Sequence, residues 1–178
     1  ASVDCGMRAE AGAIERVFVE DGEIRVRTID ERPAKGICGS GIIDAVAVLL
    51  KLGLINRSGR FIDQGHPRVA TVEGLKRYYL VRSEDSRDGR GVYIGESDIE
   101  NVITAKAAIF AAMKILLKRL DLAFTDVRRF FIAGAFGKYI DVENAISIGL
   151  IPALPAERFE FGGNTSINGA QIVAFYKE

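Results

Sequence analysis

The sequence predicts one domain in which helices and strands share a single core, a fold of the α/β or α+β class. The chain has 178 residues, of which 48% are hydrophobic, and this is enough apolar material for one full core. Apolar residues alternate in some segments and recur every three to four residues in others. The predicted order is therefore β-hairpin, helix, β-hairpin, long helix, strand, helix, strand, helix, without internal repeat or linker.

The first hairpin is predicted over residues 14–28, where the alternating runs IERVFV and IRVRTI flank Asp21-Gly22, a strong turn signal. A second pair of strands is predicted at 77–81 and 91–95, joined by a polar loop. Between the hairpins, residues 54–75 indicate an irregular connection with short strands.

Two helices follow the hairpins. The segment GSGIIDAVAVLLKLG is apolar nearly all round and predicts a buried helix, with Ser40 as its N-cap and Gly53 at its end. A longer helix is predicted from Ser97 or Asp98 to about Leu120, because its apolar residues follow a three-to-four repeat. Several alanines keep this helix slim, which allows close packing on a sheet.

The segment RFFIAGAFGKYID, residues 129–141, predicts a buried strand that ends in a glycine turn. Gly134 begins the turn and Gly137 follows three residues later. Without a Cβ, such a turn lets the backbone approach a flat ligand, and ligands gather at the carboxyl ends of strands in open α/β sheets. From these residues alone, a binding turn and a plain strand exit remain equally open.

Two further glycine turns precede helices. Gly39-Ser40-Gly41 opens the buried helix, where free N–H groups and the helix dipole suit an anion such as phosphate, although capping and tight packing are the alternative. The segment 162–166, GGNTS, is interpreted first as a turn with Asn164 or Thr165 as the cap. Asp44, near the start of the buried helix, is interpreted as structural rather than as a ligand of water or metal.

Lys106 interrupts the apolar stripe of the long helix. Its amine either reaches the edge of the stripe or faces an anionic or polar ligand. His66 is interpreted as an ordinary surface residue, since no second histidine exists for a metal site or a triad. The sequence contains no GxxxxGK[ST] loop, no GxGxxG and no nucleophile elbow, so no catalytic residue and no metal ligand is assigned.

Charge and composition exclude several classes of protein. Lysine plus arginine and aspartate plus glutamate both number 24, and this zero net charge argues against a nucleic-acid partner. No run of about 18 apolar residues exists, so no membrane partner is expected, and no signal peptide is recognised. Cys5 and Cys38 lack metal-ligand spacing and are interpreted as buried free thiols of a reducing compartment, so a cytoplasmic location is expected.

Five segments in one order resemble the C-terminal domain of the reductive activators of corrinoid proteins: CGMRAEAGAIE, GICGSGIIDAVAVLLKLGLI, SDIENVITAKAAIFA, FFIAGAFGKYIDVENAISIGLIP and GNTS. The likeness covers most of the chain and is weakest from about Gly65 to Gly91. It implies a ribonuclease-H-like half-domain of an actin-like ATPase, with a mixed sheet packed with helices. Residues 1–178 are then the C-terminal portion of that domain, and the start Ala-Ser, with the first methionine at Met7, agrees with a longer protein.

The resemblance also implies an activity. The intact protein would use ATP, with magnesium, to reduce inactive cob(II)alamin of a corrinoid methyl-transfer protein to cob(I)alamin. The electron would come from a two-iron two-sulfur cluster in an N-terminal part, and the corrinoid protein would be the partner. The segment IAGAFG resembles the family's adenosine loop, with Ala135 where a second glycine is usual. The implied nucleotide contacts are Gly134, Ala135, Phe136 and Gly137, then Gly39, Ser40 and Gly41, and last Lys106.

Two parts that such an activator requires are not recognised in these residues. ATPases of this kind hold phosphate and magnesium with Asp-x-Gly-Thr loops. The nearest segment here, Asp63-Gln64-Gly65-His66, lacks the hydroxyl residue and is followed by Pro67. The four-cysteine cluster of a ferredoxin centre is also missing. We therefore expect part of an adenosine site, no activity in this fragment alone, and an open sheet edge that invites a homo-oligomer.

Two other functions remain open at this point. A non-catalytic interaction domain of the same fold would dock the corrinoid protein without using ATP itself. A sugar or small-molecule kinase of the same superfamily is a more distant third, because no residue can be assigned as the base beside a substrate hydroxyl.

Overall fold

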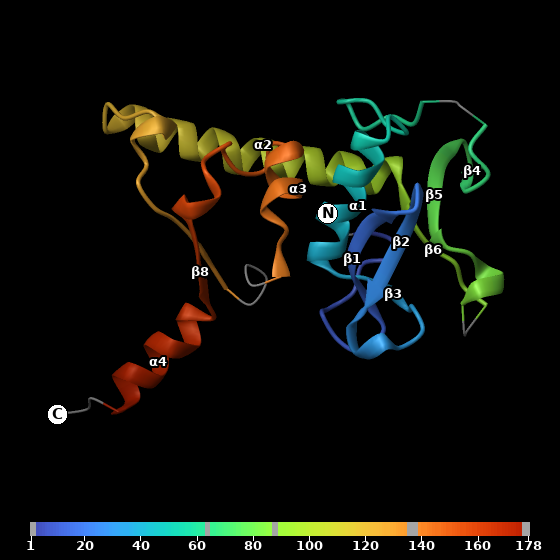
Figure 1. The fold of residues 1–178 in the computed structure, drawn as a ribbon, viewed down its shortest axis with the longest axis horizontal. Coiled ribbons are helices and arrows are strands. Elements are labelled where there is room, and N and C mark those ends of the chain that lie inside the picture. The colour runs from blue at the N-terminus through green and yellow to red at the C-terminus, as the bar shows by residue number, and fades with distance from the viewer. Residues whose placement is uncertain (1–2, 63–64, 87–88, 135–138, 176–178) are drawn as a thin grey trace.

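The computed structural model describes residues 3–62, 65–86, 89–134 and 139–175 (Figure 1). These residues form four α-helices and three small sheets, which confirms the predicted mixed class, and the first three helices share one hydrophobic cluster with the sheets. Short 3₁₀ turns connect the elements, at η1 (Ile29–Glu31), η2 (Ser83–Asp85), η3 (Phe124–Asp126) and η5 (Ala156–Arg158). No described helix has the length and apolar character needed to cross a bilayer.

The first sheet has the strand order β2-β1-β3. Strands β1 (Ala13–Glu20) and β2 (Glu23–Thr28) form the predicted antiparallel hairpin. Asp21 and Gly22 at its tip have φ values of 51° and 78°, the pair of left-handed residues that matches the twist of a two-residue hairpin. Strand β3 (Gly36–Ile37) runs parallel to β1.

Helix α1 (Gly39–Lys51) packs on β1, and its residues are buried almost throughout, as predicted. The predicted N-cap was wrong: Cys38 is the cap residue, and Ser40 lies inside the helix, where its hydroxyl donates to the Glu15 carbonyl at 2.9 Å. The cause is the close approach of α1 to β1, which turns Ser40 toward the strand. Gly53 has a φ of 69° just beyond the helix, which confirms it as the end.

The second sheet is antiparallel, with the order β4-β5-β6. Strands β5 (Leu75–Val81) and β6 (Val92–Gly95) are the predicted pair, and β4 (Val69–Val72) is a short strand of the preceding connection. Helix α2 (Glu96–Arg119) starts directly after β6. It begins earlier than predicted because Gly95 is the cap residue, and the Asp98 carboxylate accepts from the Gly95 N–H at 2.9 Å.

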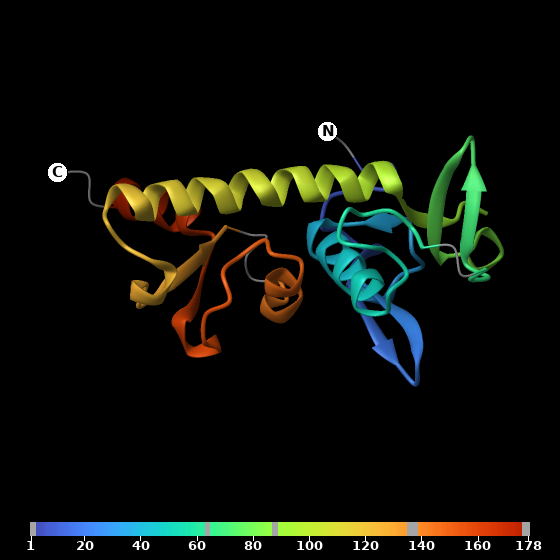
Figure 2. The same ribbon diagram turned by 90° about the horizontal axis from the view of Figure 1, so that it is seen from above.

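Helix α2 runs along much of the length of the molecule and connects the region of the first two sheets with that of β7 and β8 (Figure 2). Beyond it lie β7 (Phe130–Ala133) and β8 (Phe159–Gly163), which form a parallel pair, and α3 (Val142–Ser147), which packs against α1. Helix α4 (Thr165–Phe175) projects away from the rest of the chain (Figure 1). Asn164 accepts from the Ile167 N–H at 3.2 Å at its start, which confirms the predicted cap.

Candidate functional site

The predicted adenosine loop begins where β7 ends. Gly134 has a φ of 98°, a left-handed conformation that favours glycine, and its N–H donates to the Gly163 carbonyl at 2.6 Å. A Cβ at Gly134 would meet no described atom within 4 Å, so the turn is open on that side. Ala135, Phe136 and Gly137 lie outside the described residues. Their nucleotide contacts, and that of Gly134, remain predictions.

The Gly39-Ser40-Gly41 turn serves two purposes. Gly39 and Ser40 line a cavity of about 600 Å³ at the N-terminus of α1. Gly41 instead faces β1, where any side chain would collide with the Ile14 carbonyl oxygen. The glycine at 41 is therefore explained by packing, and Gly39 and Ser40 are the residues of this turn that line the cavity, although Ser40 is itself buried.

The cavity at α1 is also lined by two charged side chains and by a residue that follows the predicted adenosine loop. Arg8 and Glu15 line it, and so does Tyr139, the first described residue after that loop. Tyr139 thus brings the segment after the predicted adenosine loop to this cavity, whereas Gly134 is not among the described residues that line it. The positive end of the α1 dipole and the Arg8 guanidinium favour an anion there, whereas the Glu15 carboxylate opposes one.

Lys106 lies elsewhere. It is half-buried on α2 and lines a shallow cavity of about 480 Å³ with Leu50, Arg57, Ser147 and Gly149. The structure does not bring its amine to the cavity at Gly39 and Ser40, so its nucleotide contact remains a prediction without added support.

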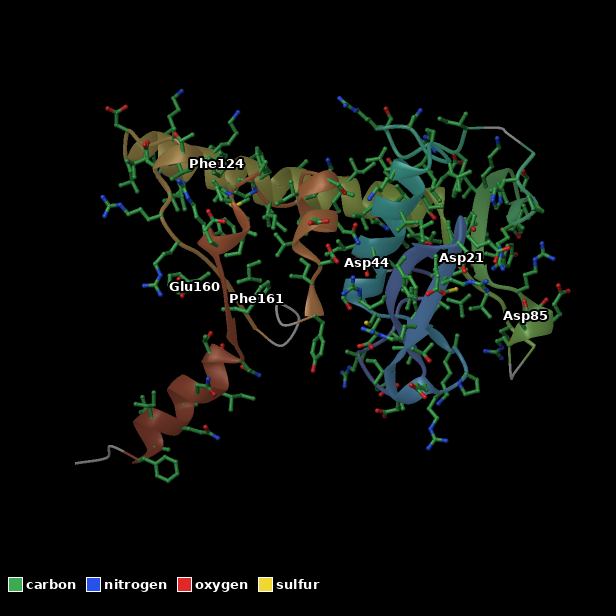
Figure 3. The ribbon with its side chains drawn as sticks, viewed as in Figure 1. Asp21, Asp44, Asp85, Phe124, Glu160 and Phe161 are labelled. Atoms are coloured by element: carbon green, nitrogen blue, oxygen red, sulfur yellow. The ribbon has the colours of Figure 1, made fainter. Side chains whose placement is uncertain are left out.

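A buried carboxylate connects the elements around these turns. Asp44 on α1 has no exposed surface (Figure 3). One of its oxygens accepts from Arg16 Nε at 2.8 Å and from the Val17 N–H at 3.2 Å, and the other accepts from Asn144 Nδ2 at 2.7 Å. These contacts support the interpretation of Asp44 as structural. Burial raises the pKa of Asp44, opposed by the Asn144 hydrogen bond and the Arg16 charge.

Arg16 extends this network to the segment that follows the predicted adenosine loop. Its second nitrogen contacts the Asp141 carboxylate at 2.7 Å, and Asp141 caps α3 by accepting from the Asn144 N–H at 3.0 Å. Strand β1, helix α1 and the start of α3 are therefore tied by charge-assisted hydrogen bonds. Sequence reasoning missed Arg16 and Asn144, although a lone aspartate in an apolar helix was a signal that a partner exists.

The remaining titratable candidates form no cluster. Cys38 is buried as expected, whereas Cys5 is only half-buried, and burial raises the pKa of its thiol. His66 packs on Tyr78 with ring centres 5.4 Å apart and accepts from the Arg68 N–H. Within the described ranges, no group of three or more His, Cys, Asp or Glu side chains could hold a metal ion.

Comparison with known proteins identifies the family. A family model described as the C-terminal domain of RACo, the ASKHA domain, matches residues 1–178. The "Corrinoid activation enzyme RamQ" of Eubacterium limosum is 38% identical over 186 residues, which cover 100% of this chain and 31% of that protein. The "[Co(II) methylated amine-specific corrinoid protein] reductase" of Methanosarcina barkeri is 31% identical over 144 residues, or 81% of this chain and 23% of that protein.

A solved structure supports the same family assignment. The "Reductive activator for corrinoid,iron-sulfur protein" superposes with a TM-score of 0.91 and 39% identity, over 97% of this chain and 28% of its own. The chain belongs to the family of reductive activators of corrinoid proteins and has the fold of their C-terminal ASKHA domain, the actin-like ATPase fold. It spans less than a third of the length of the relatives it matches.

Proposed function

We propose that this chain is the C-terminal part of the ATPase domain of an ATP-dependent reductive activator. The intact protein returns inactive cob(II)alamin of a corrinoid methyl-transfer protein to cob(I)alamin. The observation that carries this proposal is the match of fold and sequence along the whole chain, at a TM-score of 0.91 and 39% identity to a reductive activator. The corrinoid protein is the proposed partner, and the cytoplasm the proposed location.

Within this function, the chain contributes part of a nucleotide site. The adenosine would lie against the turn that Gly134 opens, where the missing Cβ leaves room for a flat ring. The phosphates would lie toward Gly39 and Ser40, where the α1 dipole and Arg8 attract negative charge. Support for the phosphate contact is the cavity of about 600 Å³ that Gly39, Ser40 and Arg8 line, and Tyr139, which follows the predicted adenosine loop, lines the same cavity.

The described residues offer no cluster of three or more ligands for magnesium and too few thiolates for the iron–sulfur cluster. These residues contain no group of carboxylates arranged for a metal ion, and Cys5 and Cys38 alone cannot supply the four thiolates of a cluster. We assign magnesium and the iron–sulfur cluster to the rest of the activator. The residues here bind and orient the nucleotide.

Substitution of the glycine turn in the intact activator tests the nucleotide site. Gly134→Val should weaken ATP binding, measured by calorimetry, at least about tenfold, because the side chain fills the ring position and strains a left-handed φ. Gly74→Val is the matched control, since Gly74 also has a positive φ, of 79°, and open space around it. Equal loss of ATP binding in both variants would contradict the assignment.

A non-catalytic docking domain is the second candidate, favoured by the lack of any assignable catalytic base among the described residues. The two functions differ in how they use nucleotide. Capture of a corrinoid protein that requires ATP supports the activator, and capture that is unchanged by ATP, with no ATP bound by calorimetry, supports the docking domain.

A further inference from the structure

Four residues from three segments form a closed ring of hydrogen bonds, which we call the Asp44 ring. Arg16 on β1 joins two carboxylates, that of Asp44 through Nε at 2.8 Å and that of Asp141 through Nη2 at 2.7 Å. Asn144 closes the ring, because its backbone N–H donates to Asp141 at 3.0 Å and its side-chain amide donates to Asp44 at 2.7 Å. Each member contacts two others, so the ring resists movement of any one of them.

The ring is largely shielded from water. Asp44 has no exposed surface, and the side chains of Arg16 and Asp141 retain only 32% and 26% of theirs. Charge-assisted hydrogen bonds in such a site are short and directional. The ring therefore fixes the relative positions of β1, α1 and the start of α3.

The ring lies between the two parts of the proposed nucleotide site. On the phosphate side, Ser40 donates its hydroxyl to the carbonyl of Glu15, directly before Arg16 in the chain, at 2.9 Å. On the other side, Asp141 comes two residues after Tyr139, which lines the same cavity as Ser40. The ring thus connects the turn that opens α1 with the segment that follows the predicted adenosine loop.

The two described ends of that loop are anchored by different contacts. At its start, the Gly134 N–H donates to the Gly163 carbonyl at 2.6 Å. At its end, Ile140 is buried and Asp141 pairs with Arg16. The first contact refers the loop to β8, and only the second refers it to the strand that also holds the α1 turn.

The ring itself does not line the proposed site. None of its four members is among the described residues that line the cavity of about 600 Å³ at Gly39 and Ser40. Arg16, Asp141 and Asn144 line a separate cavity of about 290 Å³. Any effect of the ring on a nucleotide therefore passes through the segments that it holds.

ATP is a ligand whose two ends depend on such spacing. A two-part ligand binds tightly only where both subsites are held at its own length, so that the second contact forms as an intramolecular event. When the spacing changes, the affinity of the whole ligand falls although each subsite keeps its own contacts.

We propose that Arg16 is a positioning residue of the nucleotide site, which through the Asp44 ring holds the segment after the predicted adenosine loop at the spacing from the α1 turn that ATP requires. The inference rests on the proposed function and adds to it the residue that sets the geometry of the site. Arginine suits this role, because its planar guanidinium directs several donors along fixed directions toward the two carboxylates.

Comparison of ATP with inorganic tripolyphosphate tests this role in the intact activator. Tripolyphosphate occupies only the phosphate side, so its binding does not depend on the spacing. Arg16→Gln and Asp141→Ala should each weaken ATP binding in calorimetry at least about tenfold, whereas tripolyphosphate binding, measured by competition with ATP, should change less than about threefold. The two substitutions change the net charge in opposite directions, so a loss that they share does not come from charge.

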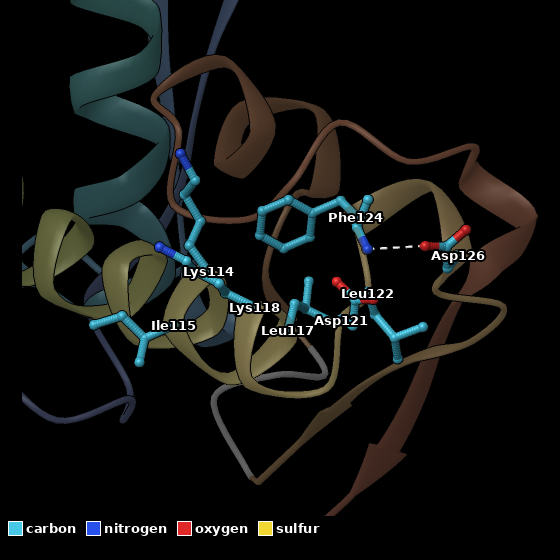
Figure 4. Close-up of a pocket in the computed structure, with 9 residues that line it drawn as sticks. Lys114, Ile115, Leu117, Lys118, Asp121, Leu122, Phe124 and Asp126 are labelled. Carbon is cyan, nitrogen blue, oxygen red and sulfur yellow. Dashed lines mark hydrogen bonds between the residues drawn. The ribbon is translucent and has the colours of Figure 1, made fainter.

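Two variants outside the ring are the matched controls. Arg25→Gln removes the same charge as Arg16→Gln, from an exposed pair with Glu23 at 3.1 Å. Asp126→Ala removes a carboxylate that also holds a turn, since Asp126 on η3 accepts from the Ala123 N–H at 2.8 Å, beside a cavity at the end of α2 (Figure 4). Both controls should bind ATP and tripolyphosphate as the wild type does.

The outcomes separate this inference from the proposed function. Equal weakening of ATP and tripolyphosphate in the ring variants indicates a purely structural role and overturns the inference, as does ATP binding that is unchanged or equally weakened in the controls. A wild-type activator that binds no ATP overturns the proposed function itself. Hydrogen exchange in α1 shows whether each variant is folded, and Asp141→Ala, at a partly exposed position, decides the test if Arg16→Gln does not fold.

Discussion

The two ends of helix α2 show opposite packing within one continuous element. The proximal part, residues 3–62, 65–86 and 89–103, buries its apolar side chains, and its exposed large ones retain only 41% to 44% of their surface. In the distal part, residues 104–134 and 155–175, the exposed large apolar side chains retain 46% to 85% of their surface. Ile99, near the start of α2, is fully buried, whereas Leu116, about five turns later, is largely exposed.

The difference shows that the apolar pattern of a helix does not by itself decide burial. Both ends of α2 have the same three-to-four spacing, but only the first end has α1, β5 and β6 beside it. Burial needs a partner surface, and the proximal part supplies its own. The following predictions test this difference in burial between the proximal and the distal part.

The largest expected effect is that of a matched pair of leucines. Leu49→Ala, at a fully buried position of α1, should lower the free energy of unfolding of this chain by about 3 kcal/mol, because it leaves a cavity. Leu116→Ala should change it by less than about 0.5 kcal/mol. Urea unfolding measures both. Similar losses in this chain would remove the contrast, and a larger loss for Leu116→Ala in the intact protein would sharpen it.

The second effect concerns the polar network of the proximal part. Asp44→Asn replaces one of the two accepting oxygens by an NH2 group, so Arg16 Nε or Asn144 Nδ2 loses its acceptor, and the free energy of unfolding should fall by about 2 kcal/mol. Asp85→Asn, at an exposed position of η2, is the control and should have no effect. A wild-type urea midpoint for Asp44→Asn would show that the network contributes no stability.

The third effect is a pH dependence of the same residue. Burial holds the pKa of Asp44 above its unfolded value, so the folded protein takes up this proton first as pH falls. The cost of the buried charge is present at neutral pH and is relieved between the raised pKa and about pH 4. The stability of wild type relative to Asp44→Asn should therefore increase toward acid, measured by urea unfolding of both at each pH. A constant or decreasing difference would contradict the raised pKa.

The smallest expected effect lies in the distal part. Glu160→Gln breaks the pair with Arg129, whose hydrogen bond lowers the pKa of Glu160, but water screens both side chains. The thermal midpoint of this chain should not change measurably. A clear decrease would mean that the distal part is stabilised by its own surface contacts and that the contrast with the proximal part is weaker.

Much of the architecture could be predicted from local pattern. Alternation and Asp21-Gly22 predicted the first hairpin, and Gly53 predicted the end of α1, since both depend on residues close in sequence. The N-cap of α1 was wrong because the approach of β1, which is not a local property, turns Ser40 toward Glu15. The start of α2 was also misplaced, because Gly95 supplies the cap backbone while Asp98 supplies only the side chain.

The candidate site also has features that the sequence predicts and features that only the structure shows. The glycine turns at 39–41 and at Gly134 could be recognised in the sequence, because positions without a Cβ are visible as residue types. The sequence could not show that Gly39, Ser40 and Tyr139 line one cavity or that Lys106 lies outside it. These residues come from separate segments of the chain. The sequence also could not reveal the partners of Asp44, because Arg16 and Asn144 lie 28 and 100 residues away along the chain.

By itself, the sequence determined the family, the mixed class and the order of helices and strands, because these depend on residue types and their local spacing. Only the tertiary structure decided which apolar stripes are buried, which glycine of the α1 turn serves packing and which faces the cavity. It also decided that, among the described residues, no third strand pairs with the β7–β8 sheet. Burial and pairing depend on surfaces that distant segments bring together, so the apolar pattern of a segment does not by itself decide whether it is buried.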